Sequence, residues 1–196
     1  MSKKTNVFQD PTIVGNPKRQ FIILAVVLFA FWCLLCWNFT AKFIAVGLAS
    51  SLIASYICYP LLLMENASGT KKYYAFDVNL FKYVMYWIWL LNEMRKATMD
   101  VAKSVGKAEM DINPKMFKFK MVYDNPFASL TLANSITFTP GTITVSVTED
   151  GIYTIHALID GAREGLIDGG MQEKIAKLFG EEFNYVAEEY VEEGEV

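Results

Sequence analysis

The sequence predicts a membrane protein that combines a transmembrane helical hairpin, an amphipathic helix and a small α+β domain. Residues 21–64 form an almost uninterrupted apolar block whose only formally charged side chain is Lys42. Residues 80–105 begin as an apolar and aromatic run and become charged in their second half. Residues 111–196 carry short β-branched runs separated by turn residues, a pattern typical of strands in a water-soluble domain.

The apolar block is predicted to cross the membrane twice. A hydrocarbon core of about 30 Å requires about 20 apolar residues in a helix, so the block is too long for one crossing and suits two. Backbone groups in lipid must be bonded within the segment, which favours helices over Phe21–Trp37 and Phe43–Met64. Three polar residues mark the turn between them: Asn38, Thr40 and Lys42.

Residues 1–20 are predicted to be a polar N-terminal extension without regular structure, because Pro11 and Pro17 interrupt them. Its basic residues place the N-terminus in the cytoplasm under the positive-inside rule, and Lys71 and Lys72 after the second helix agree with that orientation.

The second membrane helix carries a stripe of small residues. Gly47, Ser51 and Ser55 recur every four positions and therefore share one face of the helix. Small residues let another helix approach closely, so this helix-packing stripe implies a protein partner within the membrane. The alternative is that the pattern reflects only the ordinary frequency of small residues in membrane helices.

The stretch 80–105 is interpreted as an amphipathic helix at the cytoplasmic membrane surface. Its clean apolar run is short, and its aromatic side chains suit the headgroup region. A third crossing would carry Arg95 and Lys96 to the side opposite the basic N-terminus, whereas an interfacial helix avoids this conflict. A steep or partial crossing is the alternative.

The cytoplasmic domain at 111–196 is predicted to have the order β-α-β-β-α, one sheet with helices on one side. Asp124-Asn125-Pro126 is a helix-start signal, Thr139–Thr142 a turn and Glu149-Asp150-Gly151 a hairpin signal. The final helix is interrupted by Gly180, and the acidic tail Glu181–Glu195 is interpreted as a solvated face. The predicted strands and helices are Lys115–Tyr123, Phe127–Ser135, Ile143–Thr148, Ile152–Ile159 and Met171–Tyr190.

Several kinds of chemistry are not expected. A subunit that conducts protons or cations needs ionisable residues at membrane depth, and the hairpin has none apart from Lys42 at its turn. The chain has one histidine, His156, so a histidine-based metal cluster is excluded, and a lone histidine in a strand is typically structural or part of an interface. Motifs for phosphate loops, zinc proteases and nucleophile elbows are absent, so the sequence predicts no enzyme, catalytic residue, metal or cofactor.

Composition adds two further exclusions. The formal net charge of −3 is too small to indicate a nucleic-acid partner. All three cysteines lie in the apolar hairpin, which argues against a disulfide-built secreted domain: Cys33, Cys36 and Cys58.

Two motifs in the soluble part resemble a known family. The run Leu132–Thr142 (LANSITFTPGT), followed by Tyr153–Leu158 (YTIHAL), resembles the E subunit of Mrp-type, also called Mnh-type, multisubunit Na⁺/H⁺ antiporters. Phe138 replaces the leucine common in that family, and the H-A-L element is intact. The resemblance extends to the layout of nearly the whole chain, although residues 1–20 are longer than the family leads one to expect.

This resemblance implies an accessory, non-conducting subunit of a complex in the bacterial cytoplasmic membrane that exchanges internal Na⁺ for external H⁺. In that family the ion-conducting helices belong to large polytopic subunits, which are the implied partners together with small membrane subunits and the bilayer. Monovalent cation efflux and pH homeostasis are the implied roles. An alternative is a membrane-anchored binding or scaffold module whose α+β domain senses a ligand or protein.

The motif itself is expected to be structural or to serve docking. Its short polar side chains are able to cap a helix or bond nearby backbone, and Pro140-Gly141 sets a tight turn. It therefore predicts a helix-to-strand reversal that either presents a docking surface to a neighbouring subunit or the membrane face, or only closes the domain's own fold. The residues assigned to it are Asn134, Ser135, Thr137, Thr139, Pro140, Gly141, Thr142 and His156.

Overall fold

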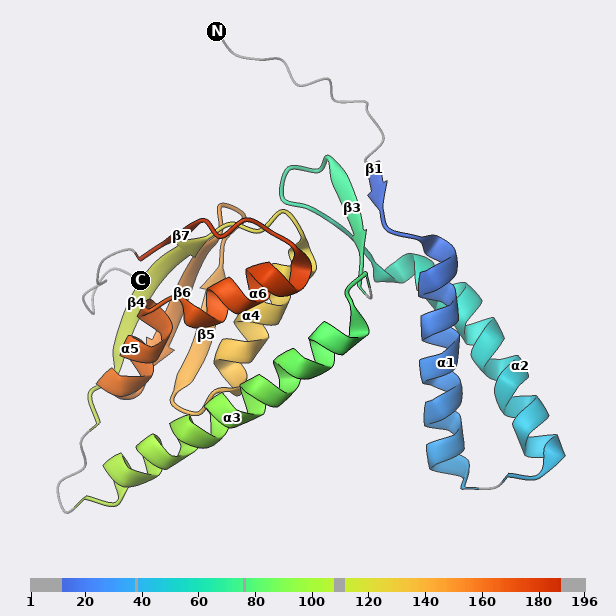
Figure 1. Cartoon of the computed structure of the whole chain (residues 1–196), viewed down its shortest axis with the longest axis horizontal. Helices are drawn as coiled ribbons and strands as arrows, with labels where there is room; N and C mark the ends of the chain where they lie inside the picture. Colours follow the sequence, from blue (N-terminus) through green and yellow to red (C-terminus); the bar gives the residue numbers. More distant parts are fainter. Residues whose placement is uncertain (1–11, 38, 76, 108–111, 188–196) are drawn as a thin grey trace, which may run out of the picture. The chain divides into compact units, whose positions relative to one another are not determined.

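The computed structural model describes residues 12–37, 39–75, 77–107 and 112–187. They belong to two compact units, one ending at Asp77 and the other starting at Val78 (Figure 1). The predicted turn residue Asn38 and the predicted domain start at Asp111 lie outside the described residues.

The first unit contains a hairpin of two long apolar helices. Helix α1 spans Pro17–Cys36 and helix α2 spans Ala41–Cys58, followed by the short 3₁₀ helix η1 at Tyr59–Leu62. α1 and the stretch Ala41–Leu62 are each long and apolar enough to cross a membrane, and few of their residues are buried. The helical hairpin predicted from the sequence is therefore present, within a membrane-associated protein. The second helix is shorter than the predicted Phe43–Met64, because the chain tightens into a 3₁₀ helix at Tyr59 and is extended at Met64.

Helix α1 begins earlier than predicted because of its cap. The side chain of Asn16 accepts a hydrogen bond from the N–H of Lys18 at 3.0 Å, and Pro17 occupies the first helical turn, where its missing N–H costs nothing. At the other end Trp37 adopts a left-handed conformation with φ 47°, and its N–H bonds the carbonyl of Cys33.

The small-residue stripe packs inside the hairpin. Gly47, Ser51 and Ser55 are the buried residues of α2. A Cβ atom on Gly47 would lie 2.3 Å from Cδ1 of Trp32, whose Nε1 donates to the carbonyl of Phe43 at 3.3 Å. The stripe is thus a packing face, but at Gly47 its neighbour is α1 of the same chain. The inference of a separate membrane partner at this face was wrong.

A small three-stranded sheet completes the first unit. Strand β1 (Thr12–Val14) pairs in parallel with β3 (Lys71–Tyr74), which pairs antiparallel with β2 (Leu63–Glu65). Asn66 closes the β2–β3 turn by accepting from the N–H groups of Thr70 and Lys71, each at 3.0 Å. The prediction of an extension without regular structure was wrong from Thr12 onward, and residues 1–11 lie outside the described part of the chain.

The second unit opens with helix α3, Leu80–Val105, which has the predicted bounds. Asn79 caps it by accepting from the N–H groups of Phe81 and Lys82. One face, centred on Tyr86 and Leu90, packs into the core of the α+β domain. A second face is apolar and exposed, and its members are Phe81, Val84, Met85, Ile88 and Leu91.

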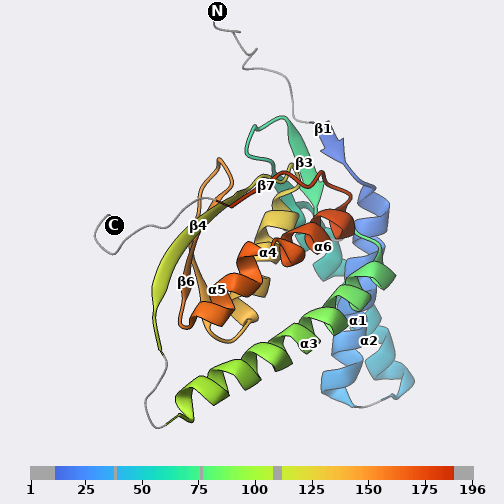
Figure 2. The same ribbon diagram turned by 60° about the vertical axis from the view of Figure 1, so that its left-hand side comes forward.

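The rest of the unit is an antiparallel sheet with helices on one face (Figure 2). The strand order is β5-β6-β4-β7, and β4 pairs with β6 from Lys115 opposite Ala157 to Lys120 opposite Ile152. The elements are β4 (Lys115–Met121), α4 (Pro126–Phe138), β5 (Thr142–Val147), β6 (Ile152–Ala157), α5 (Asp160–Ile167), α6 (Gly170–Phe179) and β7 (Tyr185–Val186).

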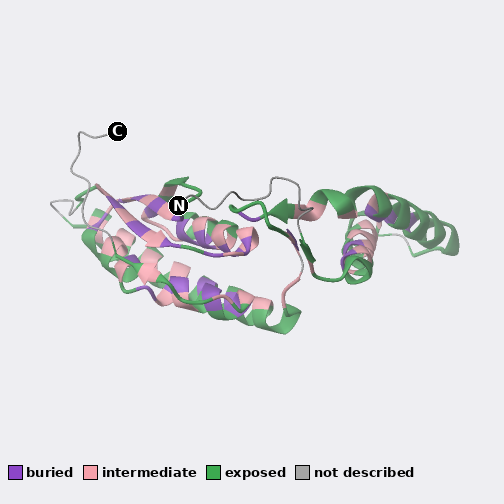
Figure 3. Cartoon of the chain, turned by 90° about the horizontal axis from the view of Figure 1, so that it is seen from above, coloured by how far each residue is buried: buried purple, intermediate pink, exposed green. Residues whose placement is uncertain are grey.

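The core follows from strict alternation along β4 and β6. Phe117, Phe119 and Met121 point toward the helices and are almost fully buried, while the lysines between them point to the other face. The ring of Phe119 stacks on Tyr153 of β6 with centroids 4.9 Å apart. Figure 3 shows buried residues alternating with partly exposed ones along these strands.

Four elements of the domain differ from the prediction. Helix α5 and strand β7 were not predicted, and α4 continues to Phe138 rather than ending at Ser135. The predicted helix Met171–Tyr190 ends at Phe179, because Gly180 takes a left-handed conformation with φ 72° and caps it.

Part of the acidic tail is also more than a solvated face. Glu181 accepts hydrogen bonds from the N–H groups of Asp124 and Asn125 at 3.0 and 3.1 Å, which fixes the start of α4 against the end of α6. Residues 188–196 of the tail lie outside the described residues.

Replacing Gly47 by leucine should weaken the hairpin. The new side chain would have to displace the Trp32 indole, and overpacking of this kind costs about 1–3 kcal/mol. Ala49→Leu is the matched control, because Ala49 lies on an exposed face of the same helix. SDS-induced unfolding in mixed micelles, followed by circular dichroism, should give a lower midpoint for Gly47→Leu alone. Equal midpoints would contradict the packing described.

Two glycines with open space around them should respond oppositely to alanine. No atom lies within 4 Å of a Cβ placed on Gly165 or Gly180, but only Gly180 has a left-handed φ. Gly180→Ala should therefore lower the free energy of unfolding by about 1–2 kcal/mol, whereas Gly165→Ala, inside α5, should raise it by about 0.5–1 kcal/mol. Thermal unfolding of both full-length variants measures this, and the same sign in both would be inconsistent with the helix end at Gly180.

Candidate functional site

The motif identified from the sequence forms the reversal from α4 into β5. Thr139 ends the helix: its N–H bonds the carbonyls of Ser135 and Ile136 at 3.2 and 3.1 Å, and its hydroxyl donates to Ser135 O at 2.9 Å. The last carbonyls of a helix have no partner within the helix itself, so these bonds satisfy groups that would otherwise be orphaned.

Thr142 completes this cap from the first position of β5. Its side chain is buried, and its hydroxyl lies 2.6 Å from Ile136 O and 3.0 Å from Thr139 O, so that its single proton is shared between the two carbonyls. Its N–H also bonds Thr139 O at 3.2 Å. The strand is therefore fastened to the end of the helix by one threonine.

A second pair of threonines extends the attachment. The N–H of Thr144 donates to the hydroxyl of Thr137 at 3.2 Å. The hydroxyls of Thr137 and Thr144 both donate to the carbonyl of Ala133, at 3.0 and 2.9 Å respectively. The hydroxyl groups of the reversal are thus used within the chain rather than left for a partner.

Gly141 allows the close approach of three elements. Its φ is +90°, and a Cβ atom there would lie 3.1 Å from Val101 Cγ2 of α3 and 3.5 Å from Ala162 of α5. Its carbonyl accepts the N–H of Leu158, just after β6, at 2.8 Å. A side chain at this position would be strained in its backbone and crowded against α3.

Ser135 ties the reversal to α3. The hydroxyl of Tyr86 donates to Ser135 Oγ at 2.7 Å, and Ser135 in turn donates to Thr131 O at 2.7 Å. Burial raises the pKa of Tyr86 to about 12, although its hydrogen bond to Ser135 acts in the opposite direction. Tyr86 is consequently a neutral donor throughout the physiological range.

A cavity of about 390 Å³ lies beside the reversal. Its walls are α3, α5, the start of α6 and the turn at Thr139-Pro140. Lys174 sits 4.9 Å from the centre of the Trp89 ring on one wall, and Lys96 is paired with Glu93 at 2.8 Å on another. Within the described ranges, no three His, Cys, Asp or Glu side chains are grouped so as to hold a metal ion.

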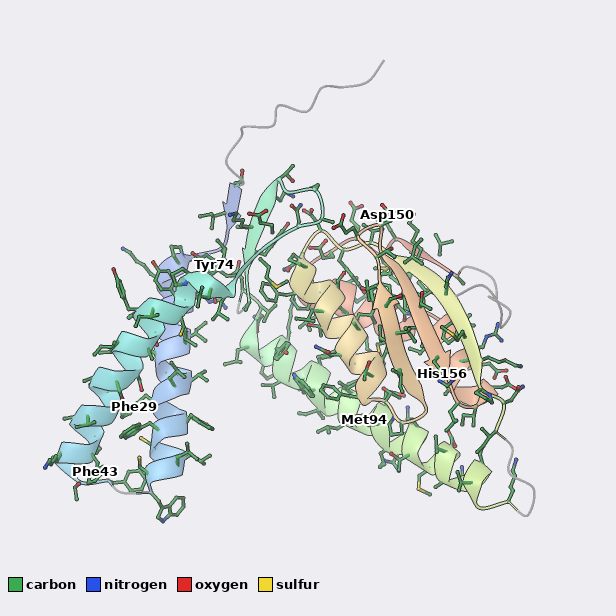
Figure 4. All side chains as sticks on the ribbon, turned by 180° about the vertical axis from the view of Figure 1, so that it is seen from behind. Phe29, Phe43, Tyr74, Met94, Asp150 and His156 are labelled. Atoms are coloured by element: carbon green, nitrogen blue, oxygen red, sulfur yellow. The ribbon has the colours of Figure 1, made fainter. Side chains whose placement is uncertain are left out.

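The remaining two motif residues point elsewhere. Asn134 is exposed on α4, and its side chain bonds no described residue. His156 lies on the face of the sheet opposite the helices, between Ile143 on β5 and Met116 on β4 (Figure 4). The structure therefore gathers Ser135, Thr137, Thr139, Gly141 and Thr142 into one reversal and leaves His156 outside it.

Sequence reasoning missed three contributors to this site: Tyr86, Val101 and Thr144. Tyr86 and Val101 are both distant in sequence from the motif. Tyr86 was interpreted as one of the aromatic residues suited to the lipid headgroups, whereas it is buried in the domain core, and the helical spacing of Val101 indicated only an apolar face. Thr144 stands within a β-branched run and was interpreted only as a strand residue. A run of threonines on both sides of Pro140-Gly141 is the one local signal that predicts such bonds.

Comparison with known proteins identifies the family. Residues 25–178 match the family model described as Na⁺/H⁺ ion antiporter subunit. A protein of Staphylococcus saprophyticus named Na(+)/H(+) antiporter subunit E1 is 25% identical over 164 residues, covering 82% of this chain and 96% of that protein. The protein of the same name from Staphylococcus aureus strain JH9 is 26% identical, covering 82% of this chain and 97% of that protein.

A solved structure shares the fold. A chain from the membrane-bound sulfane sulfur reductase, an archaeal respiratory membrane complex, superposes with a TM-score of 0.60 at 26% identity. The superposition covers 82% of this chain and 99% of that one. With its membrane helices, its α+β domain and most of its length matched, the chain belongs to the family of Na⁺/H⁺ ion antiporter subunits.

Proposed function

We propose that this chain is an accessory, non-conducting subunit of a multisubunit antiporter that exchanges Na⁺ or another monovalent cation for H⁺. The observation that carries the proposal is the distribution of charge in the hairpin. In α1 and α2 the formally charged residues are Lys18 and Arg19 at the start of α1 and Lys42 at the start of α2. An ion pathway requires ionisable side chains deep in the membrane, so the transported ions pass through other subunits.

The partners are the large polytopic subunits and the small membrane subunits of the complex. The staphylococcal relatives are named as subunits of an antiporter. The chain with the similar structure belongs to a respiratory membrane complex. By analogy this chain supports assembly and activity in cation efflux and pH homeostasis, in the bacterial cytoplasmic membrane.

Helix α3 lies along the cytoplasmic membrane surface in this proposal. Its buried face is occupied by the α+β domain, whereas its second apolar face is exposed over the first three turns. Such a face fits the boundary between headgroups and acyl chains, and Lys82 at its margin suits anionic lipid. The N-terminus and the α+β domain are then both cytoplasmic, as positive-inside charge placement favours.

The motif at α4–β5 acts mainly by fixing the reversal. Its threonine and serine hydroxyls are engaged within the chain, which leaves Asn134 and Pro140 as the parts able to contact a neighbouring subunit. We therefore assign docking to the exposed side of this turn rather than to the whole motif.

A second candidate function is a membrane-anchored binding or scaffold module. The cavity beside Thr139 and Pro140 favours it, because a small ligand or a partner's side chain would find both apolar and charged walls there. Purification of the tagged chain from its native membrane separates the two: large polytopic partners support the antiporter subunit, and a solitary chain supports the module.

The chain reconstituted alone into sealed vesicles should show no sodium-coupled proton movement. The expected trace of a pH-sensitive dye after a Na⁺ pulse equals that of empty vesicles, whereas vesicles holding the purified complex should respond. The same complex purified from cells lacking this chain should give a reduced yield or reduced flux. Sodium-dependent flux through the isolated chain would refute the non-conducting role.

Substitutions at Thr142 and Asn134 should separate folding from docking. Thr142→Val removes the hydroxyl bond to the carbonyl of Ile136, which keeps the N–H of Thr139 as a donor, and should lower the free energy of unfolding by about 0.5–1.5 kcal/mol. Asn134→Ala removes an exposed side chain and should change stability by less than about 0.5 kcal/mol, while reducing the amount of other subunits that co-purify. If the Asn134→Ala variant co-purified with undiminished amounts of the other subunits, docking at this residue would be contradicted and the motif would have only an internal structural role.

A further inference from the structure

The sheet of the second unit has an outer face that is basic and apolar. We define it by Met116, Lys118 and Lys120 of β4, Ile143 of β5 and His156 of β6, which lie on the face away from the helices. The strands that form the sheet contain no acidic residue. Lys118 and Lys120 form no ion pair with any residue in the described ranges. The outer face therefore has uncompensated positive charge.

One edge of the sheet is open beside this face. Strand β7 covers β4 only at Lys120 and Met121, opposite Val186 and Tyr185. The N–H of Met121 donates to Gly151 on the β6 side at 2.8 Å. In an antiparallel ladder the backbone groups of alternate residues point to opposite sides, so those of Met116 and Lys118 point to the β7 side. Among the described strands nothing pairs with them.

The sequence that follows β7 has the composition to occupy this edge. Residues 188–196, EEYVEEGEV, include five glutamates and lie outside the described residues. Continuing the register of Lys120 opposite Val186 would set Glu188 opposite Lys118 and Tyr190 opposite Met116. The side chains of Glu188 and Tyr190 would then lie on the outer face, where Lys118 complements the charge of the glutamate and Met116 the apolar ring of the tyrosine.

We propose that the acidic segment 188–196 docks on its own chain, extending β7 along the open edge of β4 and placing Glu188 beside Lys118. Directly opposite residues of opposite charge stabilise an antiparallel pair, and backbone hydrogen bonds to an unpaired edge supply the rest. The tether of one residue after β7 keeps the segment at a high effective concentration. An exposed edge strand is a template for pairing with other chains, and this docking removes it.

Amide exchange in the full-length chain in lipid nanodiscs tests the proposal. With lysine and phenylalanine labelled with ¹⁵N, the Lys118 amide should exchange about tenfold or more slowly than in a variant truncated after Ala187. The Phe119 amide, which faces β6, is the internal control and should not change. Equal exchange of Lys118 in both proteins would overturn the proposal. The proposal would also be overturned if the Lys118 amide were protected only when other subunits are present, whether or not residues 188–196 are. That result would indicate that a strand of a partner protein pairs with this edge.

Disulfide trapping checks the register independently of exchange. In a chain whose three cysteines are replaced by alanine, Lys118→Cys with Glu188→Cys should cross-link under mild oxidation. Lys118→Cys with Glu189→Cys is the matched control, because a shift of one residue turns the side chain to the other face. Cross-linking of the first pair alone supports the register, and equal cross-linking of both pairs contradicts it.

Discussion

The end of helix α4 is the constraint on which the second unit depends. Its last carbonyls need donors, and the hydroxyls of Thr139 and Thr142 supply them while turning the chain directly into β5. Since β5 pairs with β6 from Thr142 opposite Ala157, the same bonds set the register of the sheet relative to the helix. Ser135 and Gly141 then bring in α3, the first through Tyr86 and the second through close contact with Val101. The motif, for which the sequence left both docking and closure of the domain's own fold open, thereby connects α4, β5 and α3.

The hairpin obeys a different constraint, because lipid provides no hydrophobic drive for two helices to associate. Close packing at Gly47 holds the two helices together instead, because the Trp32 indole occupies the space that a side chain at position 47 would need. Since this small-residue face is used within the chain, the surface that the hairpin leaves exposed consists largely of bigger apolar residues elsewhere on α1 and α2. Those surfaces are compatible with lipid and with a protein partner alike.

Long and periodic segments were predictable from the sequence, and short or non-local ones were not. Helix α3 has the predicted bounds because its helical periodicity extends over many turns. Strand β1 was missed because three residues carry no readable period and their partner, β3, lies far along the chain. The final helix was predicted to continue past Gly180 with only an interruption there, whereas this glycine takes a left-handed conformation and ends the helix. The site was predicted by its resemblance to a family, but its contacts with α3 required tertiary structure.

The missed strand β7 changes how the acidic C-terminal region is understood. As the continuation of a helix, these glutamates would be a solvated face, and their charge would have no particular neighbour. With the helix ended at Gly180, Glu181 instead bonds the backbone at the start of α4, and the ring of Tyr185 packs at a tilt against Phe119, with centroids 5.8 Å apart. The chain is thus led from the helix layer to the side of β4, where Lys118 and Lys120 stand without carboxylate partners among the described residues. The glycine cap therefore decides the path of the described chain after α6: it turns Tyr185 and Val186 into a strand beside β4 instead of continuing the helix into solvent.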